Sequence, residues 1–149
     1  MNQLTGGFRL LEHTADVYIE SWGRTLEEAF EWAAIGMFEV MTDLKKVDAK
    51  EKYEISVKGE DLYALLYEWL EELLFIFGSQ GKVFSRFKVH KITKKEDNGY
   101  ILSGEAWGET FNIKKHTQKT EVKAVTYSLM EIIKNKSTEQ WFVRFVLDI

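Results

Sequence analysis

The sequence predicts a single α+β domain in which two amphipathic helices pack against largely antiparallel β-sheets. Two segments carry apolar residues at the three-and-four spacing of a helix, and several others alternate between apolar and polar residues as strands do. Short turns join most of the predicted strands, which favours antiparallel pairing because parallel strands need long crossover connections. The chain has 149 residues, of which 45% are hydrophobic and 30% charged, and we expect residues 1–149 to form one soluble domain.

Two short strands and a helix open the chain. Phe8–Glu12 and Val17–Ser21 are strand-like, with a polar break between them. Thr25 is a good helix N-cap and has Glu28 at the capping-box spacing. The apolar spacing after it predicts an amphipathic helix of about four turns. Its apolar residues are Leu26, Phe30, Ala33, Ala34, Met37, Phe38 and Met41.

A strand and a second helix come next. Tyr53–Lys58 alternates between apolar and polar residues, Asp61 can cap a helix, and Gly78 fits the end of that helix. The wide apolar stripe favours a deeply buried helix, and a partner-binding surface along its edge is the alternative. The stripe consists of Leu62, Leu65, Leu66, Trp69, Leu70, Leu73 and Phe77, widened by Tyr63, Tyr67 and Leu74.

A β-hairpin is predicted after the second helix. Phe84–Thr93 and Tyr100–Trp107 have strand patterns, and Asn98-Gly99 between them is typical of a tight hairpin turn. We therefore expect these two strands to pair directly.

The last part of the chain is also expected to be β. Residues 122–133 fit both helical and strand spacing, and we interpret them as a strand from about Val125. Residues 135–139 are polar and predict a turn. Gln140–Asp148 predicts a strand with one apolar face, formed by Trp141, Val143, Phe145 and Leu147.

Composition excludes several classes of site. The chain has no cysteine, so disulfides, cysteine-ligated zinc, iron–sulfur clusters and thiol nucleophiles are excluded. The net charge is −4, whereas a protein that binds RNA through charge alone is expected to be basic, so we expect no strong direct RNA binding. No apolar segment reaches the length of a membrane span and residues 1–7 do not resemble a signal peptide, which predicts a cytoplasmic protein without membrane contact.

No familiar catalytic motif is present in the sequence. Phosphate-binding glycine loops, the GxSxG elbow, the HExxH spacing and the EF-hand loop are all missing. His13, His90 and His116 are far apart along the chain. They could converge on a metal ion, but separate histidines are more often surface or hydrogen-bonded residues, so a three-histidine site is disfavoured.

Two aspartates occupy unusual positions. Asp16 precedes a strand, and Asp148 lies near the end of a hydrophobic strand, beside the carboxylate of Ile149. If the fold brings Asp16 close to them, the three negative charges either raise one another's pKa or hold a hard cation such as calcium or magnesium. The alternative is that Asp16 caps a turn and Asp148 lies in a frayed terminus.

A basic stretch lies between the hairpin and the last strands. It contains Lys114, Lys115 and His116, and an acidic residue, Glu121, follows it. These side chains could contact a phosphate or an acidic partner, and they could equally form an ordinary solvated loop.

The residues resemble the archease family in spaced blocks that run in order from Phe8 to Ile149. Such agreement along the chain is far more specific than one short motif. The blocks are Leu11–Val17, Trp22-Gly23, Leu26–Phe30, Gly36–Phe38, Met41–Leu44, Leu70–Leu74, Gly108-Glu109, Thr120–Tyr127 and Leu147–Ile149.

The resemblance implies a function in RNA ligation. Archeases are small accessory proteins of the RtcB-type tRNA-splicing ligase. They promote guanylylation of the ligase, allow it to turn over repeatedly and broaden the nucleotides that it accepts. An archease is not known as an enzyme, so the resemblance implies an activator without a catalytic residue of its own.

The resemblance also implies site residues. The family binds Ca²⁺ or a similar divalent ion such as Mg²⁺ or Mn²⁺, and the matching ligands here are Asp16, Asp148 and the carboxylate of Ile149. Ligase activation depends on a glutamate that matches Glu121 and on a preceding lysine that matches Lys115 or Lys114. The turn after Ile133 lacks a glycine that many members have, which leaves the geometry of that hairpin open.

Two other function classes remain as alternatives. A general chaperone or protein-binding module would use the aromatic surface of the second helix. A metal-dependent hydrolase would use Asp16 and Asp148, and is the less favoured of the two.

Overall fold

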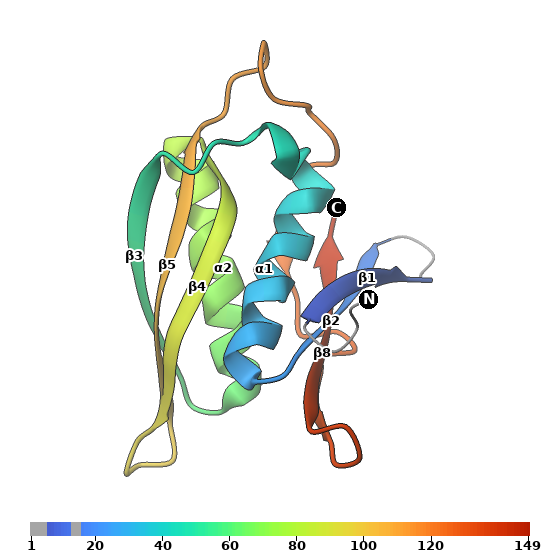
Figure 1. Cartoon of the computed structure of the whole chain (residues 1–149), viewed down its shortest axis with the longest axis vertical. Helices are drawn as coiled ribbons and strands as arrows, with labels where there is room; N and C mark the ends of the chain where they lie inside the picture. Colours follow the sequence, from blue (N-terminus) through green and yellow to red (C-terminus); the bar gives the residue numbers. More distant parts are fainter. Residues whose placement is uncertain (1–5, 13–15) are drawn as a thin grey trace.

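The computed structural model describes residues 6–12 and 16–149, and these form two antiparallel sheets with two helices (Figure 1). In one sheet of the described residues, β1, β2, β8 and β6 are neighbours in that order, and β7 also pairs with β8. Its strands are β1 (Gly6–Leu11), β2 (Val17–Gly23), β6 (Ala124–Val125), β7 (Glu131–Asn135) and β8 (Gln140–Asp148).

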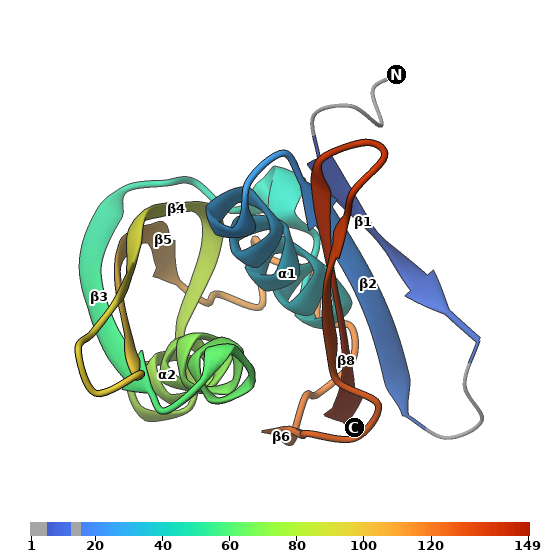
Figure 2. The same ribbon diagram turned by 90° about the horizontal axis from the view of Figure 1, so that it is seen from below.

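The second sheet has the order β3-β5-β4. Its strands are β3 (Glu51–Gly59), β4 (Lys82–Lys94) and β5 (Tyr100–Thr110). Helix α1 (Leu26–Met41) lies between the two sheets and packs on β2 and β4, while α2 (Leu62–Gln80) packs mainly on β3 (Figure 2). A short 3₁₀ helix, η1 (Leu44–Lys46), follows α1. The predicted α+β class with antiparallel sheets is confirmed.

An aromatic core joins the helices to the second sheet. Phe38 of α1 packs edge-to-face on Phe84 of β4, with ring centroids 5.6 Å apart, and Trp69 of α2 packs on Phe87 at 6.4 Å. The indole N–H of the fully buried Trp69 donates to the backbone oxygen of Phe30 at 2.9 Å. This hydrogen bond satisfies the one polar atom of that side chain and ties α2 to α1.

The predicted starts of both helices are confirmed. Thr25 Oγ1 accepts a hydrogen bond from Glu28 N–H at 3.0 Å, and Asp61 Oδ1 accepts from Ala64 N–H at 2.8 Å. Each bond satisfies a backbone donor that the first helical turn leaves free.

The predicted end of α2 is wrong by one turn. The helix continues through Gly78 to Gln80, and Gly81 is the capping residue, with φ of 70° and its N–H bonded to the oxygen of Phe77 at 2.8 Å. A left-handed residue is what ends a helix in this way, and Gly81, not Gly78, adopts that conformation.

The predicted continuous strand from Val125 is also wrong. It is divided into β6 and β7, and residues 126–130 between them form a tight turn. Thr126 Oγ1 donates to the oxygen of Val146 and accepts from Ser128 N–H, and Leu129 has a φ of 56°. The bond to Val146 holds the Thr126 hydroxyl on β8, and the bond from Ser128 turns the chain away from the ladder at this point.

The last hairpin forms without a glycine. The loop between β7 and β8 is closed by Glu139 N–H bonded to the oxygen of Asn135 at 2.8 Å, and Glu139 takes the left-handed conformation with φ of 62°. The buried residues Val143, Phe145 and Leu147 alternate along β8, which confirms the predicted apolar face.

We expect Glu139→Gly to stabilise the protein by about 0.5 kcal/mol, because a left-handed residue with a Cβ costs about 1–2 kcal/mol and glycine offsets part of that gain through its greater unfolded-state entropy. The lost ion pair between Glu139 and Lys134, at 3.5 Å, is exposed and contributes little. Urea unfolding measures the change. Lys136→Gly in the same turn, where φ is not positive, is the matched control and should destabilise; equal effects of the two variants would contradict the argument.

Candidate functional site

Pairing of β2 with β8 brings the two predicted aspartates together. The register pairs Val17 with Leu147, so its continuation by one residue places Asp16 opposite Asp148. On the other side of β8, Ala124 pairs with Asp148, and Lys123 N–H donates to the backbone oxygen of Asp148 at 2.7 Å. Directly opposed residues of an antiparallel pair share a face. A register continued in this way would put both carboxylates on one face of the sheet, with Asp16 in the bend that precedes β2.

The surroundings of these aspartates suit a cation. Asp148 is exposed and Asp16 is half-buried, and within residues 6–12 and 16–149 no hydrogen bond or ion pair to either side chain is found. Like charges directly opposite each other are destabilising, and a bound cation would remove that cost. The side chain of Ile149 packs against the core, which holds the backbone of this residue in place.

The donor set at this end is small. In the described part of the chain, no group of three or more His, Cys, Asp and Glu side chains is close enough to hold a metal ion. The predicted donors are two aspartate carboxylates and the carboxylate of Ile149, and all of them are hard oxygen ligands of the kind that Ca²⁺ and Mg²⁺ prefer. This chemistry fits a surface ion that keeps several water ligands.

The histidines have separate environments where the structure describes them. His13 lies outside the described residues. His90 is on β4 and contacts Glu105 of β5 at 2.9 Å. His116 is buried at the other end of β5, where it contacts Glu109 at 2.9 Å. Each of the latter two histidines is therefore engaged by a carboxylate of its own.

The buried carboxylate of Glu109 organises the basic stretch, and the residue patterns alone did not single it out. It is 7% exposed, and its Oε2 accepts hydrogen bonds from Lys115 Nζ at 2.7 Å, from the backbone N–H of Asp48 at 2.8 Å and from His116 at 2.9 Å. Lys50 lies 3.5 Å from its other oxygen. The only sequence signal for this cluster was the Gly108-Glu109 block of the family resemblance.

The hydrogen bonds of His116 fix its tautomer when neutral. Its Nδ1 accepts from the backbone N–H of Asn112 at 2.8 Å, so Nε2 carries the proton and donates to Glu109. The backbone N–H of His116 donates to the backbone oxygen of Asn112 at 2.7 Å. The ring thus closes the turn 112–116 onto the buried carboxylate, and this part of the predicted loop is not a simple solvated segment.

The charges of this cluster shift the ionisation of its members. Burial raises the pKa of Glu109, but the hydrogen bonds from Lys115, Asp48 and His116 outweigh it and lower the pKa to about 2. Hydrogen bonds to Asp48 and Glu109 raise the pKa of Lys115. Glu109 and Lys115 therefore both stay charged throughout the physiological pH range, so their ion pair can hold the loop in place.

The two candidate lysines differ in their contacts. Lys115 Nζ is bound to Glu109 and, at 2.8 Å, to Asp48. Lys114 is exposed, and although its backbone N–H bonds to Asn112, no partner of its ammonium group is found within the described residues. Lys115 is thus held within the protein, and Lys114 presents the more accessible cation.

The next segment is fixed to the end of α1. The backbone N–H groups of Lys119 and Thr120 donate to the oxygens of Met41 and Val40, both at 3.1 Å, and Thr42 Oγ1 donates to the oxygen of Thr117 at 2.7 Å. The two backbone bonds satisfy carbonyls that the last turn of the helix leaves free, and the Thr42 hydroxyl bond ties the helix end to the loop. The loop after β5 therefore crosses the end of the molecule where α1 ends (Figure 1).

Glu121 follows this anchored segment directly and is exposed. It lines a cavity of about 350 Å³ whose other walls are mostly apolar. Because Phe111 of that cavity packs on the His116 ring, with centroids 5.5 Å apart, the cavity and the Glu109 cluster are neighbours. The remaining lining residues are Met41, Phe77, Val83, Gln118 and Thr120.

A second buried carboxylate joins the strands of the five-stranded sheet. Glu20 is 3% exposed and accepts from Arg9 Nε and Arg144 Nε, each at 2.8 Å. Arg144 also bonds to Glu131 at 3.1 Å. These ion pairs link β1, β2, β8 and β7, and they are structural.

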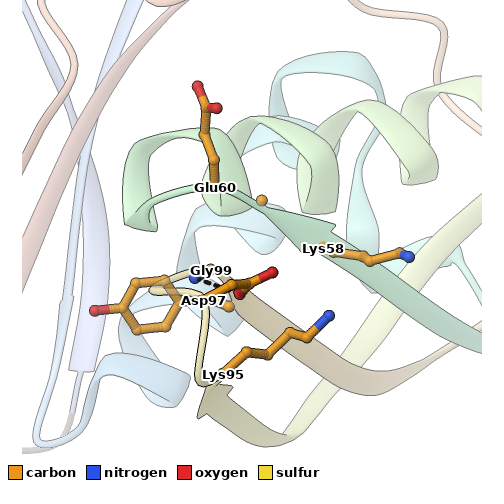
Figure 3. Close-up of a pocket in the computed structure, with 7 residues that line it drawn as sticks. Lys58, Glu60, Lys95, Asp97 and Gly99 are labelled. Carbon is orange, nitrogen blue, oxygen red and sulfur yellow. Dashed lines mark hydrogen bonds between the residues drawn. The ribbon is translucent and has the colours of Figure 1, made fainter.

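A surface groove of about 420 Å³ lies at the opposite end of the molecule, between the β4–β5 hairpin and the end of β3. Figure 3 shows Lys58 and Lys95 extending to the same side, away from Glu60. Asp97 accepts a hydrogen bond from Gly99 N–H at 3.0 Å, as a turn residue does. None of the predicted site residues lies in this groove.

These features define an α+β protein whose buried carboxylates hold loops and strands in place, with Asp16 and Asp148 next to the last residue pair of the β2–β8 ladder. The pattern of the Archease protein family matches residues 8–149, and the chain belongs to this family. Membership supports an accessory role in RNA ligation and tRNA splicing.

Named relatives come from distant organisms. The chain is 49% identical to protein archease of Thermococcus kodakarensis over 93% of this chain and 95% of the relative. It is 41% identical to an archease-like protein of Drosophila melanogaster over 95% of this chain and 90% of the relative. The solution structure of Methanobacterium thermoautotrophicum protein 1598 has a TM-score of 0.83 and 43% identity over 96% of this chain and 99% of that one. Neither helix of the described residues has the length and apolarity to cross a membrane.

The depressed pKa of Glu109 predicts a pH-dependent contribution to stability. A carboxyl group with a folded-state pKa of about 2 stabilises the protein fully above its ordinary value near 4.5, and loses this contribution as the pH falls toward 2. We expect Glu109→Gln to destabilise the protein by about 2–3 kcal/mol at pH 7, because it removes one partner of a buried ion pair. Urea unfolding should show this difference shrink between pH 4.5 and pH 2. A difference that stays constant over this range would show that the charge of Glu109 is not its source.

Proposed function

We propose that this protein activates an RtcB-type tRNA-splicing ligase, by promoting guanylylation of the ligase and its repeated turnover and by broadening its use of nucleotides. The observation that carries the proposal is the pairing of β2 with β8, which opposes Asp16 and Asp148 in a member of the archease family. The protein would act in the cytoplasm as an accessory factor, with the ligase as the enzyme.

The proposed ion site consists of Asp16, Asp148 and the carboxylate of Ile149. Its opposed carboxylates and its hard oxygen ligands support Ca²⁺, with Mg²⁺ or Mn²⁺ as alternatives. When bound, the ion would supply positive charge and Lewis acidity at an exposed end of the protein. The two strands would supply rigidity, because Asp148 is paired within the sheet and the other two ligands are directly attached to strand ends.

The proposed partner-facing residues are Glu121 with Lys115 or Lys114. Glu121 is exposed and follows a segment that backbone hydrogen bonds fix to α1, so its carboxylate can be presented to a partner at little entropic cost. Because Lys115 is bound to Glu109, its proposed role is to hold the loop, and Lys114 is the lysine that would contact the partner. A net charge of −4 supports action through the ligase and not through tight RNA binding.

The deciding experiment measures GTP-dependent guanylylation and RNA joining by the cognate ligase under multiple-turnover conditions, with and without this protein. The proposal requires that a substoichiometric ligase joins many RNA ends only when the protein is present. Equal help to unrelated client proteins would favour a general chaperone. Hydrolysis of phosphoesters by the isolated protein would favour a metal-dependent hydrolase.

Glu121→Ala is expected to reduce ligase stimulation at least 10-fold while the fold and ion binding stay intact, because the side chain is exposed and outside the proposed ion site. Glu54→Ala, an exposed glutamate on β3, is the matched control and should keep full stimulation. Circular dichroism monitors the fold and calorimetry monitors the ion. Full stimulation by Glu121→Ala would remove this residue from the site.

Asp148→Asn and Asp16→Asn are each expected to weaken Ca²⁺ binding at least 10-fold, because affinity depends on the number of charged ligands. A few residues appended after Ile149 should weaken binding as well, since a peptide bond replaces the carboxylate. Calorimetry with Ca²⁺ measures the affinities, and circular dichroism should show an unchanged fold. Equal Ca²⁺ affinity of the extended and native chains would exclude the Ile149 carboxylate as a ligand. If both asparagine variants bind Ca²⁺ as tightly as the native protein, the proposed ion site is excluded.

A further inference from the structure

One surface of the protein exposes aromatic and apolar side chains next to β6. On α2, Tyr63 is 42% exposed and Tyr67 lies one turn further along the same face. The ring of Tyr127 stacks on that of Tyr67 with centroids 4.7 Å apart and an interplanar angle of 7°. Tyr127 and Leu129 of the 126–130 turn are each 53% exposed. We call these four residues the tyrosine surface.

The backbone of the turn keeps this exposure in place. Leu129 has a φ of 56°, a conformation that a side chain with a Cβ rarely adopts. The turn is closed by Met130 N–H bonded to the oxygen of Tyr127 at 3.2 Å, and Thr126 Oγ1 fixes it to Val146 of β8 at 2.8 Å. The fold thus holds an exposed leucine in a strained conformation, which is typical of a functional site.

The rim of the tyrosine surface is acidic. Partial burial raises the pKa of the Tyr127 hydroxyl, and the negative charges of Glu68, Asp61 and Glu60 raise it further. All three carboxylates are exposed on or next to α2. A ligand that carries phosphates would be repelled here, whereas a cationic ligand would be attracted.

Strand β6 connects the tyrosine surface to the end of β8 that bears Asp148. Val125 of β6 pairs with Leu147, and Tyr127 follows two residues later. Helix α2, β6 and the C-terminus lie on the same side of the molecule (Figure 2), and α2 contacts β6 directly. One partner could therefore cover both the tyrosine surface and the Asp148 end.

We propose that the tyrosine surface docks a basic protein segment, in which an arginine stacks on an exposed tyrosine ring and an apolar side chain covers Leu129. Arginine matches both features of the surface, because its planar guanidinium stacks on aromatic rings and pairs with carboxylates. Tyrosine is also among the residues that dominate binding energy at interfaces. The inference deepens the proposed function, since it names the surface with which the protein would hold the ligase.

Two other occupants are less favourable. An RNA strand would bring phosphates against Glu60, Asp61 and Glu68. A second copy of this chain, related by two-fold symmetry, would place the same acidic rims together. Both occupants would have to overcome repulsion between like charges.

The first test uses NMR titration of the ¹⁵N-labelled protein with a blocked peptide, Ac-Arg-Leu-Arg-Arg-Leu-Arg-NH₂. Resonances of Tyr63, Tyr127 and Leu129 should shift, and the same peptide with glutamate at the arginine positions should leave them unchanged. Glu68→Lys should weaken arginine-peptide binding at least 10-fold. Glu54→Lys, the same charge change on exposed β3, should alter it less than 2-fold.

Leu129→Asn separates docking from folding. Asparagine tolerates the left-handed conformation, so the denaturation midpoint should rise or stay equal while peptide affinity falls at least 3-fold. No shifts on the tyrosine surface at millimolar peptide would overturn the proposal. It would also be overturned by shifts there with an RNA oligonucleotide instead of the peptide, or by a dimer of this chain that Leu129→Asn disrupts.

The second test uses the cognate RtcB-type ligase. Glu68→Lys should lower the affinity of this protein for the ligase at least 10-fold and leave its Ca²⁺ affinity unchanged. Glu54→Lys should leave the affinity for the ligase unchanged. Unchanged ligase affinity in Glu68→Lys would overturn the assignment of this surface to the ligase. If the peptide maps to the surface but the wild-type protein neither binds nor stimulates the ligase, the proposed function fails and the basic-segment docking surface stands.

Discussion

The pairing of β8 with strands on both of its sides is the constraint on which the other features depend. On one side β2 sets the register that opposes Asp16 to Asp148, and on the other side β6 and β7 fix the ends of the 126–130 turn. A shift of one residue would move Val143, Phe145 and Leu147 out of the core, so burial of this face specifies the register strongly. The position of the candidate ion ligands is therefore a consequence of how the hydrophobic core packs.

Where no strand is present, a buried carboxylate holds the backbone in place instead. The segment between β5 and β6 has no regular secondary structure, and its backbone polar groups need partners elsewhere. Glu109 gathers Lys115, His116 and the N–H of Asp48, and the end of α1 accepts the backbone donors of Lys119 and Thr120. Glu121 follows these anchors, so its position is set by the core of the protein although its side chain is exposed.

Sequence patterns predicted those features that local interactions decide. The caps at Thr25 and Asp61 depend on residues three positions away, and both were predicted correctly. The Glu109 cluster was missed, because its partners come from separate loops and a lone glutamate at the end of a strand has no pattern of its own. The division of residues 122–133 was missed because hydrogen bonds from Thr126, not hydrophobic spacing, interrupt the strand. The opposition of Asp16 and Asp148 needed the register, which alternating hydrophobicity cannot supply for two strands so far apart along the chain.

An accessory protein that activates an enzyme must do more than bind it. Contacts that are equally strong before and during the enzyme's reaction increase occupancy of the complex but do not lower the barrier. An aromatic surface that contains the stacked rings of Tyr67 and Tyr127 is suited to the first task, because such rings are preorganised for binding. The proposed ion site at the end of β8 would suit the second, since a cation held there would interact with charge that develops on a phosphate. The turn that carries Tyr127 and the residue Asp148 are both fixed to β8. A partner held at the tyrosines would therefore meet the aspartates at a constant distance and orientation. Under this condition, binding energy can be converted into positioning.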